Sequence, residues 1–201
     1  MSHFNLVANS WDTPEKIELS KHYAQKILHL SKNKTPKKIL EVGCGTGLLG
    51  ANFLNENSSL LGVDTSEGML KVFEEKFKGL NAKSLLLNLE KEDFEDSIKE
   101  KSFDLIISSM SFHHIKDPEK IILKLKKYLA SEGTLAIIDL DKEDGSFHPD
   151  PKNMGVFHFG FSDETTKSWA QLSHFETYSR ECVHTIYKNE KNYPLFLAAF
   201  S

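Results

Sequence analysis

The sequence predicts an α/β fold in which a mostly parallel sheet is covered by helices on both faces. Short apolar runs with β-branched residues alternate with longer segments whose apolar residues recur at helical spacing, and this alternation is typical of βαβ units. The runs are mostly apolar, as expected for strands that are buried on both faces. With 201 residues, 39% of them hydrophobic, the chain has enough residues for a single domain, residues 1–201, with a sizeable core.

Seven segments have the composition of strands, and this number sets the size of the predicted sheet. The last two, residues 174–187 and 195–200, follow each other closely, so we expect them to pair as a C-terminal antiparallel hairpin. The five earlier strands are predicted at residues 38–42, 60–63, 85–87, 103–107 and 135–138.

Helices are predicted between and after these strands from their apolar spacing and their start signals. Thr13, Ser66 and Asp117 can each cap a helix, and Pro14 and Pro118 suit the first turn, where a missing N–H costs nothing. The predicted helices are residues 13–30, residues 48–54, the segment after Ser66, the segment after Asp117 and residues 162–172.

Residues 141–161 interrupt this alternation, because they contain Gly, Pro and His and show little periodicity. A loop of this length in a compact domain is usually functional or mobile. It follows the fifth strand, so we expect it to lie on the substrate side of the site. The predicted organisation is an N-terminal helical segment (1–35), a core of alternating strands and helices (37–140), this loop, and a C-terminal helix and hairpin (162–201).

A glycine-rich loop, Glu41-Val-Gly-Cys-Gly-Thr-Gly47, connects the first strand to the helix predicted at residues 48–54. Its glycines allow the backbone to touch a ligand, since no Cβ intervenes, and the helix would direct free N–H groups and its positive end toward that ligand. Asp64 ends the next strand, where a carboxylate can accept hydrogen bonds from the ribose hydroxyls of an adenosine. The sequence therefore predicts a nucleoside-bearing cofactor at this edge of the sheet.

Two cofactors are compatible with this loop. Gly45-Thr-Gly47-Leu-Leu-Gly50 matches the dinucleotide fingerprint G-x-G-x-x-G, which alone is weak evidence. Glu41 favours S-adenosyl-L-methionine (SAM) instead, because its carboxylate can meet the ammonium group of that cofactor, and a dinucleotide has no such group. The fingerprint would also start late in the loop.

Four segments resemble the motifs of class I SAM-dependent methyltransferases, in the order and spacing of that family. They are Ile39–Gly47, Gly62–Ser66, Phe103–Ile115 and Glu132–Asp139, and the similarity covers residues 37–140. The resemblance is to small bacterial methyltransferases of the methyltransferase-11/12 type, and it implies a Rossmann-like seven-stranded sheet. The cofactor-binding residues that it implies are Trp11, Glu41, Gly43, Cys44, Gly45, Gly47, Asp64, Thr65, Met69, Asn88, Leu89, Ser108 and Ser109.

Candidates for the acceptor side are the histidines near the ends of the fourth and fifth strands. We expect His113, His148 and His158 to be catalytic, since a histidine there can act as a base near neutral pH. His114 and Asp139 lie close to them in the sequence. Their spacing matches no compact metal motif, so no metal is expected. Trp11-Asp12 resembles the lid of the family, which would exclude water from the site.

The bulk properties limit the partners. The net charge is −4, which argues against a surface that wraps nucleic acid. No apolar run approaches membrane-spanning length, no secretory signal is evident at the N-terminus, and Cys44 and Cys182 suit a reducing cytoplasmic setting.

The function predicted from these observations is in-line transfer of a methyl group from SAM to a nitrogen, oxygen or sulfur atom of a small molecule. Two alternatives stay open. One is a SAM-binding domain without transferase activity, as a sensor or partner subunit. The other is a NAD(P)-dependent oxidoreductase.

Overall fold

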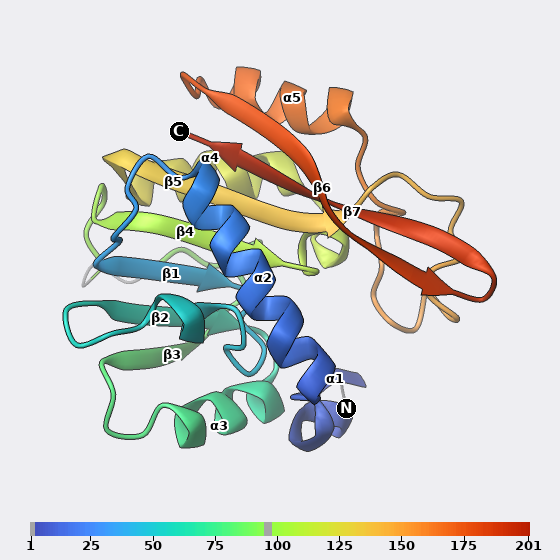
Figure 1. Cartoon of the computed structure of the whole chain (residues 1–201), viewed down its shortest axis with the longest axis horizontal. Helices are drawn as coiled ribbons and strands as arrows, with labels where there is room; N and C mark the ends of the chain where they lie inside the picture. Colours follow the sequence, from blue (N-terminus) through green and yellow to red (C-terminus); the bar gives the residue numbers. More distant parts are fainter. Residues whose placement is uncertain (1–2, 95–97) are drawn as a thin grey trace.

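The computed structural model describes residues 3–94 and 98–201, and these residues form a seven-stranded sheet with helices on both faces (Figure 1). The strand order is β3-β2-β1-β4-β5-β7-β6. Strands β1 to β5 pair in parallel, whereas β7 runs antiparallel between β5 and β6. The strands are β1 (Lys38–Val42), β2 (Ser59–Asp64), β3 (Ala82–Leu86), β4 (Phe103–Ser109), β5 (Leu129–Leu140), β6 (Tyr178–Lys188) and β7 (Lys191–Phe200). The predicted α/β fold with a mostly parallel sheet is confirmed.

Strand β5 is much longer than the run predicted at residues 135–138. Leu129 already pairs with Phe103 of β4, and after a shift in register Thr134 pairs with Leu105. The segment around Gly133, which precedes the predicted strand, therefore lies inside β5. Strand β3 begins and ends earlier than predicted, because residues 82–86 are the ones that pair with β2.

A turn of two residues joins the two strands of the C-terminal hairpin. Asn189 and Glu190 connect β6 to β7 with φ angles of 52° and 61°, as in the two-residue turns that match the twist of antiparallel strands. Strand β6 begins at Tyr178 rather than at residue 174, because His174 has a φ of 52° and ends the turn after helix α5. The predicted antiparallel pair is confirmed, with this later start.

Four of the helices begin with a side-chain cap. Thr13, Ser66, Asp117 and Ser162 each accept a hydrogen bond from the backbone N–H three residues later, and such caps satisfy N–H groups that the helix leaves unpaired. The helices are α1 (His3–Val7), the 3₁₀ turn η1 (Ala8–Ser10), α2 (Pro14–Leu30), η2 (Gly50–Phe53), α3 (Glu67–Lys76), η3 (Phe112–His114), α4 (Pro118–Tyr128) and α5 (Asp163–Leu172).

The α-helix predicted at residues 48–54 is wrong, because this segment forms turns and the short 3₁₀ helix η2. The N–H of Gly50 donates to the Glu41 carboxylate at 3.2 Å, and the Asn52 side chain donates to the carbonyl groups of Leu48 and Leu49. Side-chain bonds of this kind compete with an α-helical ladder. The glycine loop is therefore not followed by the N-terminus of an α-helix. The expectation that such a helix directs free N–H groups and its positive end toward the ligand is wrong.

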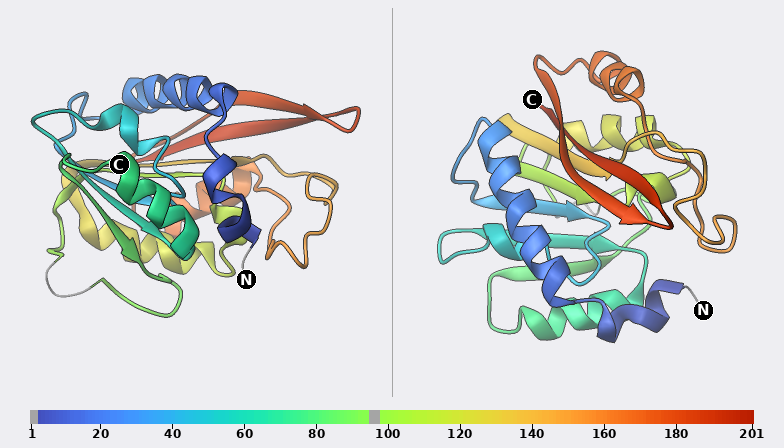
Figure 2. Two further views of the ribbon diagram at one scale, coloured as in Figure 1. Left: turned by 90° about the horizontal axis from the view of Figure 1, so that it is seen from below. Right: turned by 45° about the vertical axis from the view of Figure 1, so that its right-hand side comes forward.

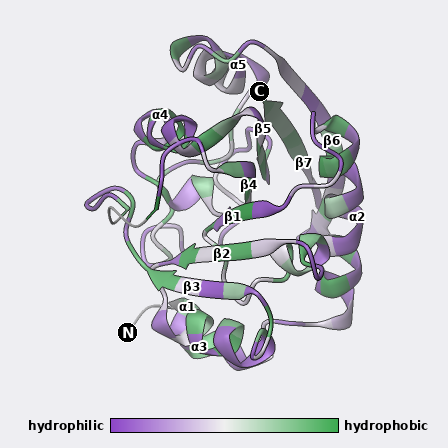
Figure 3. Cartoon of the chain, turned by 90° about the vertical axis from the view of Figure 1, so that its left-hand side faces the viewer, coloured by the Kyte–Doolittle hydropathy of each residue, from purple (hydrophilic) through white to green (hydrophobic). Residues whose placement is uncertain are grey.

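Alternate residues along each strand pack into two separate cores, one on each face of the sheet. One core contains buried residues of α2 and α3, and the other contains buried residues of α4 and α5. Figure 2 shows the sheet edge-on between these layers, and Figure 3 shows apolar residues along the strands. Within the part of the chain that the structure describes, no helix has both the length and the apolar character required to cross a bilayer.

Candidate cofactor and acceptor site

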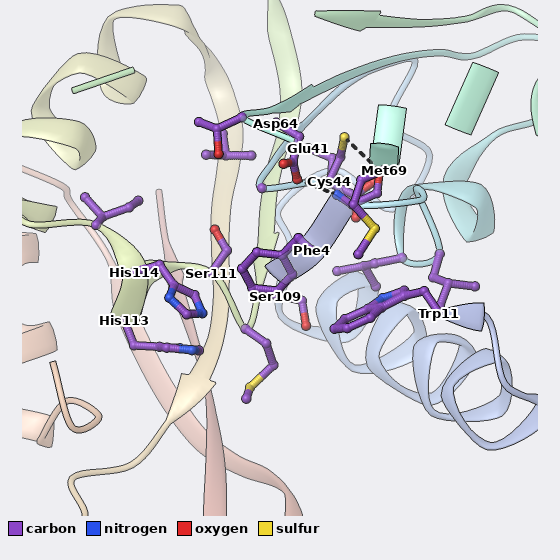
Figure 4. Close-up of a pocket in the computed structure, with 18 of the residues that line it drawn as sticks. Phe4, Trp11, Glu41, Cys44, Asp64, Met69, Ser109, Ser111, His113 and His114 are labelled. Atoms are coloured by element: carbon purple, nitrogen blue, oxygen red, sulfur yellow. Dashed lines mark hydrogen bonds between the residues drawn. The ribbon is translucent and has the colours of Figure 1, made fainter. Parts of the chain in front are cut away.

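A cavity of about 1720 Å³ opens at the edge of the sheet where β1, β2, β3 and β4 end. In open α/β sheets ligands bind at the carboxyl ends of the strands. This cavity exceeds the roughly 300–1,000 Å³ of a typical small-molecule pocket, so it has room for two molecules side by side. Its glycine-loop side and its histidine side appear together in Figure 4.

The glycine loop forms one end of the cavity, and its shape depends on glycine. Gly43, Gly45 and Gly47 have φ angles of 65°, 52° and 76°, a region that other residues avoid. A Cβ on Gly43 would lie 2.1 Å from the Ser111 hydroxyl oxygen. The loop thus brings its backbone to the cavity at Gly43 and Gly45 without side chains in the way.

Asp64, at the end of β2, holds this loop in place. One carboxylate oxygen accepts the N–H of Gly45 and the other accepts the N–H of Ser66, both at 2.8 Å. A carboxylate has about four acceptor positions, so two are left for hydroxyl groups of a ligand in the cavity that Asp64 lines. Burial raises the pKa of Asp64 above its ordinary value. Asp64 therefore organises the loop and can also bind a ligand.

Glu41 lies at the back of the same end, and its side chain is nearly inaccessible to solvent. It is 3% exposed, and its one described hydrogen bond comes from the N–H of Gly50. Burial raises the pKa of Glu41 to about 8, with the Asp64 charge adding to that rise. A cation bound here would restore the ionised form, which makes Glu41 suitable for an ammonium group.

Most of the other residues expected to bind cofactor line the cavity, but two do not. Those that line it are Trp11, Cys44, Thr65, Met69, Asn88, Leu89 and Ser109. Ser108 is 1% exposed and donates to the Val42 carbonyl at 2.8 Å, because successive residues of a strand point to opposite faces. Gly47 faces Phe73 and Phe77 of the core. Ser108 and Gly47 were both expected to bind the cofactor, but neither of them lines the cavity.

The lining residues that were missed from the sequence include Phe4, Met110 and Ser111. Met110 follows β4 and has a φ of 54°, a left-handed value that is uncommon and strained for a non-glycine residue. No sequence signal marks this strain. Ser111 and Met110 could have been found only as neighbours of Ser109.

The N-terminal segment covers the cavity on the side of the glycine loop. Phe4 and Trp11 line it, with ring centres 6.1 Å apart. Asp12 accepts a hydrogen bond from the Thr46 hydroxyl at 2.5 Å and forms an ion pair with Lys76 at 2.6 Å. These contacts place the predicted lid over the loop. The first two residues of the predicted 1–35 segment lie outside the described residues.

The other end of the cavity contains three histidines. His113 and His114 belong to η3, and His148 comes from the loop after β5, with ring centres 4.2–5.8 Å apart. The Nδ1 atom of His113 lies 2.6 Å from a carboxylate oxygen of Asp139, which is fully buried. Burial and the neighbouring His113 lower the pKa of His114 and of His148 to about 4. Both rings are therefore uncharged near neutral pH.

His158 does not join this group, in contrast to the expectation that it meets His148. Its ring contacts Phe161, and its Nε2 atom lies 3.3 Å from the Lys116 carbonyl. Its backbone N–H donates to the His113 carbonyl, as does that of Phe157. His158 thus helps to hold the loop against η3, and it does not line the cavity.

The loop of residues 141–161 is closed at its base. Asp141 and Phe161 form a bridge, and Arg180 bonds to both, at 3.2 Å and 2.9 Å. A Cβ on Gly160 would lie 2.1 Å from the Asp141 carbonyl oxygen, so the base requires glycine. Of its aromatic residues, Phe147 and Phe157 line the cavity, Phe161 is buried, and Phe157 and Phe159 are both exposed.

The fold and this cavity define an α/β protein that binds a nucleoside-bearing cofactor at the carboxyl ends of its strands, with space beside it for a second molecule. The comparisons with known proteins agree. The family model for a methyltransferase domain matches residues 40–135.

Two relatives and one solved structure show the range of similarity. An uncharacterized methyltransferase of Schizosaccharomyces pombe is 29% identical over an alignment of 205 positions, which covers 80% of this chain and 72% of that protein. A malonyl-[acyl-carrier protein] O-methyltransferase of Paenibacillus is 33% identical over 104 residues, 50% of this chain and 38% of that protein. The plantazolicin methyltransferase BpumL, solved with S-adenosylhomocysteine (SAH), superposes with a TM-score of 0.71 at 17% identity, covering 98% of this chain and 88% of that one.

The matched family model, the relatives and the solved structures support a class I SAM-dependent methyltransferase with SAM as its cofactor. The chain spans less than half the length of the Paenibacillus relative. The order of its motifs, its strand order and the place of its cavity all agree with this assignment.

Proposed function

We propose that this protein transfers the methyl group of SAM to a small-molecule acceptor bound beside the three histidines. One observation supports this most directly: a single cavity is lined by Glu41 and Asp64 at one end and by His113, His114 and His148 at the other. The cofactor supplies a methyl group already attached to a good leaving group. The protein needs only to orient the acceptor in line with it and to exclude water.

The residues at the glycine-loop end of the cavity fit this cofactor. Glu41 can bind the ammonium group of the methionine part, which explains a buried carboxyl group that otherwise has only the N–H of Gly50 as a described partner. Asp64 has acceptor positions left for the ribose hydroxyls. Asn88 and Leu89 follow β3 and line the cavity, where they can contact the adenine. Ser109 and Met110 form the wall between the two ends.

The nicotinamide alternative is disfavoured by the glycines that would have to contact a pyrophosphate. In the fingerprint, the second glycine lets the backbone approach the pyrophosphate, and a helix N-terminus then binds it. Here a Cβ on Gly47 would meet Phe73 and Phe77, and one on Gly50 would meet Glu41 and Leu60. Both glycines serve packing, and no α-helix begins there.

The lid and the loop of residues 141–161 supply the exclusion of water. Phe4 and Trp11 cover the glycine-loop end of the cavity, and Phe147 and Phe157 line the histidine end. Apolar walls on both sides suit a small acceptor with an apolar part and one reactive heteroatom.

The proposal is tested by incubating the chain with SAM labelled in its methyl group and panels of small thiols, phenols and amines. We expect label in at least one acceptor, with one SAH formed per methyl group transferred. Asp64→Ala should abolish transfer, and Glu119→Gln, which changes an exposed carboxylate on α4, should not. Binding of SAH without transfer to any member of the three panels would favour the alternative of a SAM-binding domain without transferase activity.

A further inference from the structure

The histidine cluster has a geometry that the proposed function alone does not require. His113, His114 and His148 each offer one ring nitrogen, and these three atoms all lie within 4.8 Å of one another. Two of the residues are adjacent on η3, and the third comes from a separate loop, 34 positions further along the chain. One base would be enough to accept a proton, so three converging imidazoles need another explanation.

The outer nitrogen atoms of two of these rings are already held. Nδ1 of His113 lies 2.6 Å from Asp139, and Nδ1 of His114 lies 3.1 Å from the Gly155 carbonyl oxygen. Both partners are acceptors, so each Nδ1 carries the proton and each Nε2 is left with a lone pair. Histidines that bind metal ions are oriented in this way, by a carboxylate or a carbonyl on the other ring nitrogen.

Asp139 is itself fixed in this position. Besides the ring of His113, its carboxylate accepts the backbone N–H groups of His113 at 3.2 Å and Leu140 at 2.7 Å. It is 0% exposed, and its strand, β5, is paired on both sides. The ring of His113 is therefore held rigidly, as a preformed ligand would be.

We propose that His113, His114 and His148 bind one divalent transition-metal ion of the zinc type, with the remaining coordination position open to the cavity. Three imidazoles suit zinc and its neighbours in the transition series, and three protein ligands with one open position are typical of catalytic zinc sites.

Binding requires the cluster to contract. With Zn–N bonds of about 2.0–2.1 Å, tetrahedral geometry places ligand atoms about 3.4 Å apart. His148 is the ligand that has to move, because His113 is fixed by Asp139 whereas His148 lies on an irregular loop. Phe147, the residue before His148, is anchored to the hairpin, since Lys188 donates to its carbonyl at 2.7 Å and its ring packs against Tyr193, so the movement is expected in the His148 side chain.

This inference rests on the proposed function in one respect, the chemical class of acceptor. The open position would take the sulfur of a thiol or the oxygen of an acidic hydroxyl, and the ion would lower the pKa of that group. The acceptor loses its proton to solvent on binding the ion. A lone pair on the acceptor atom then forms the bond to the methyl carbon, and the bond from that carbon to the cofactor sulfur breaks, with its electron pair going to sulfur.

The site is tested with metal ions alone, on a tag-free chain treated with a chelator and then dialysed. Titration with Co²⁺ should give the visible absorption of a tetrahedral site and saturate at one ion per chain, and Zn²⁺ should displace it. His148→Ala should weaken binding of Zn²⁺ by at least 100-fold, and Asp139→Asn by about 10–100-fold, as for other partners of metal-binding histidines. His158→Ala changes a histidine of the same loop outside the cluster and should leave the affinity unchanged.

SAH binding, measured on the same samples, shows whether each variant is folded and separates this proposal from the function above. Equal Zn²⁺ affinity in the original chain and in His148→Ala, or no saturable binding in the original chain, would overturn the metal site. If SAH still binds, the proposed function is not affected by the loss of the metal site, and a free Nε2 of His113 becomes the candidate base. The opposite result, one Zn²⁺ bound but no SAH, would leave the metal site and reject the proposed function.

Discussion

The two ends of the cavity are built in different ways. The cofactor end comes from the ends of neighbouring strands and the short connection after them: Glu41 lies near the end of β1, Gly43 to Gly47 follow this strand directly, and Asp64 ends β2. The acceptor end combines η3, the end of β5 and the loop of residues 141–161. The histidine that this loop contributes, His148, lies nine residues beyond Asp139. One end is thus determined by local sequence and the other by tertiary packing. This difference predicts that single changes at the cofactor end have the largest effects.

The largest effect is expected for Asp64→Ala. This change removes the ligand's partner for the ribose and also leaves the N–H groups of Gly45 and Ser66 without their acceptor. Hydrogen bonds to a charged group contribute about 1.5–3 kcal/mol each, so SAH affinity should fall by about 3 kcal/mol or more. Asp64→Asn keeps one acceptor oxygen and should lie between the two. Calorimetry measures both, and an unchanged affinity in Asp64→Ala would refute the role of this carboxylate.

The second effect comes from Gly43→Ala, with Gly79→Ala as its matched control. Both glycines have positive φ, 65° and 82°, but a Cβ at residue 79 meets nothing within 4 Å. Gly79→Ala should therefore cost only the roughly 1–2 kcal/mol of a left-handed conformation, as seen in thermal unfolding, and leave SAH binding intact. Gly43→Ala should cost more and weaken SAH binding at least tenfold, about 1.4 kcal/mol. Equal results for the two variants would show that the loop tolerates a side chain at the cavity.

A third effect depends on pH and concerns Glu41. Its raised pKa of about 8 favours the protonated form in the folded, ligand-free chain. That stability is complete below the ordinary pKa of about 4.5 and is lost as the pH rises to about 8. A bound ammonium group favours the ionised form instead, so SAH affinity should rise from pH 6 to pH 8 by up to about tenfold per pH unit.

Glu41→Gln isolates this effect, because the amide oxygen can still accept the N–H of Gly50 while the titrating group is gone. Calorimetric titrations with SAH at three pH values should show a weaker and flatter dependence in the variant. The same pH slope in both proteins would assign the dependence to another group, such as Asp64.

The smallest effect is expected in the lid. Asp12→Asn weakens the ion pair with Lys76, whose two side chains are 25% and 26% exposed. Partly exposed pairs contribute about 0–1 kcal/mol, so stability should change little. Release of SAH, followed by stopped-flow fluorescence of Trp11 and Trp169, should become a few times faster. A large loss of affinity would mean that the lid is part of the binding site itself.

The same contrast explains what the sequence could predict. Glycines with positive φ and the caps Thr13, Ser66 and Asp117 act through neighbours within a few residues, so their pattern is visible in the chain, and Asp64 was found from its place at the end of a strand. The prediction of an α-helix at residues 48–54 is wrong because the N–H of Gly50 donates to the carboxylate of Glu41, which lies nine residues before Gly50. Local spacing contains no information about that bond.

The acceptor end was predicted less completely for the same reason. His113 and His148 were both recognised, but the convergence of His114 with them depends on how the loop of residues 141–161 packs on η3. His158 has the same composition signal as His148, yet its backbone bond to His113 turns it away from the cavity. Phe4 lines the site from the first helix, where nothing in the sequence distinguishes it from an ordinary packing residue.

The central claim, that this cavity binds SAM through Glu41 and Asp64, is tested most directly by calorimetric titration of the unmodified chain with SAH and, separately, with NAD. We predict saturable binding of one SAH per chain and no heat of binding with NAD. Binding of NAD with no response to SAH would contradict the claim, and with it the proposed transfer of a methyl group.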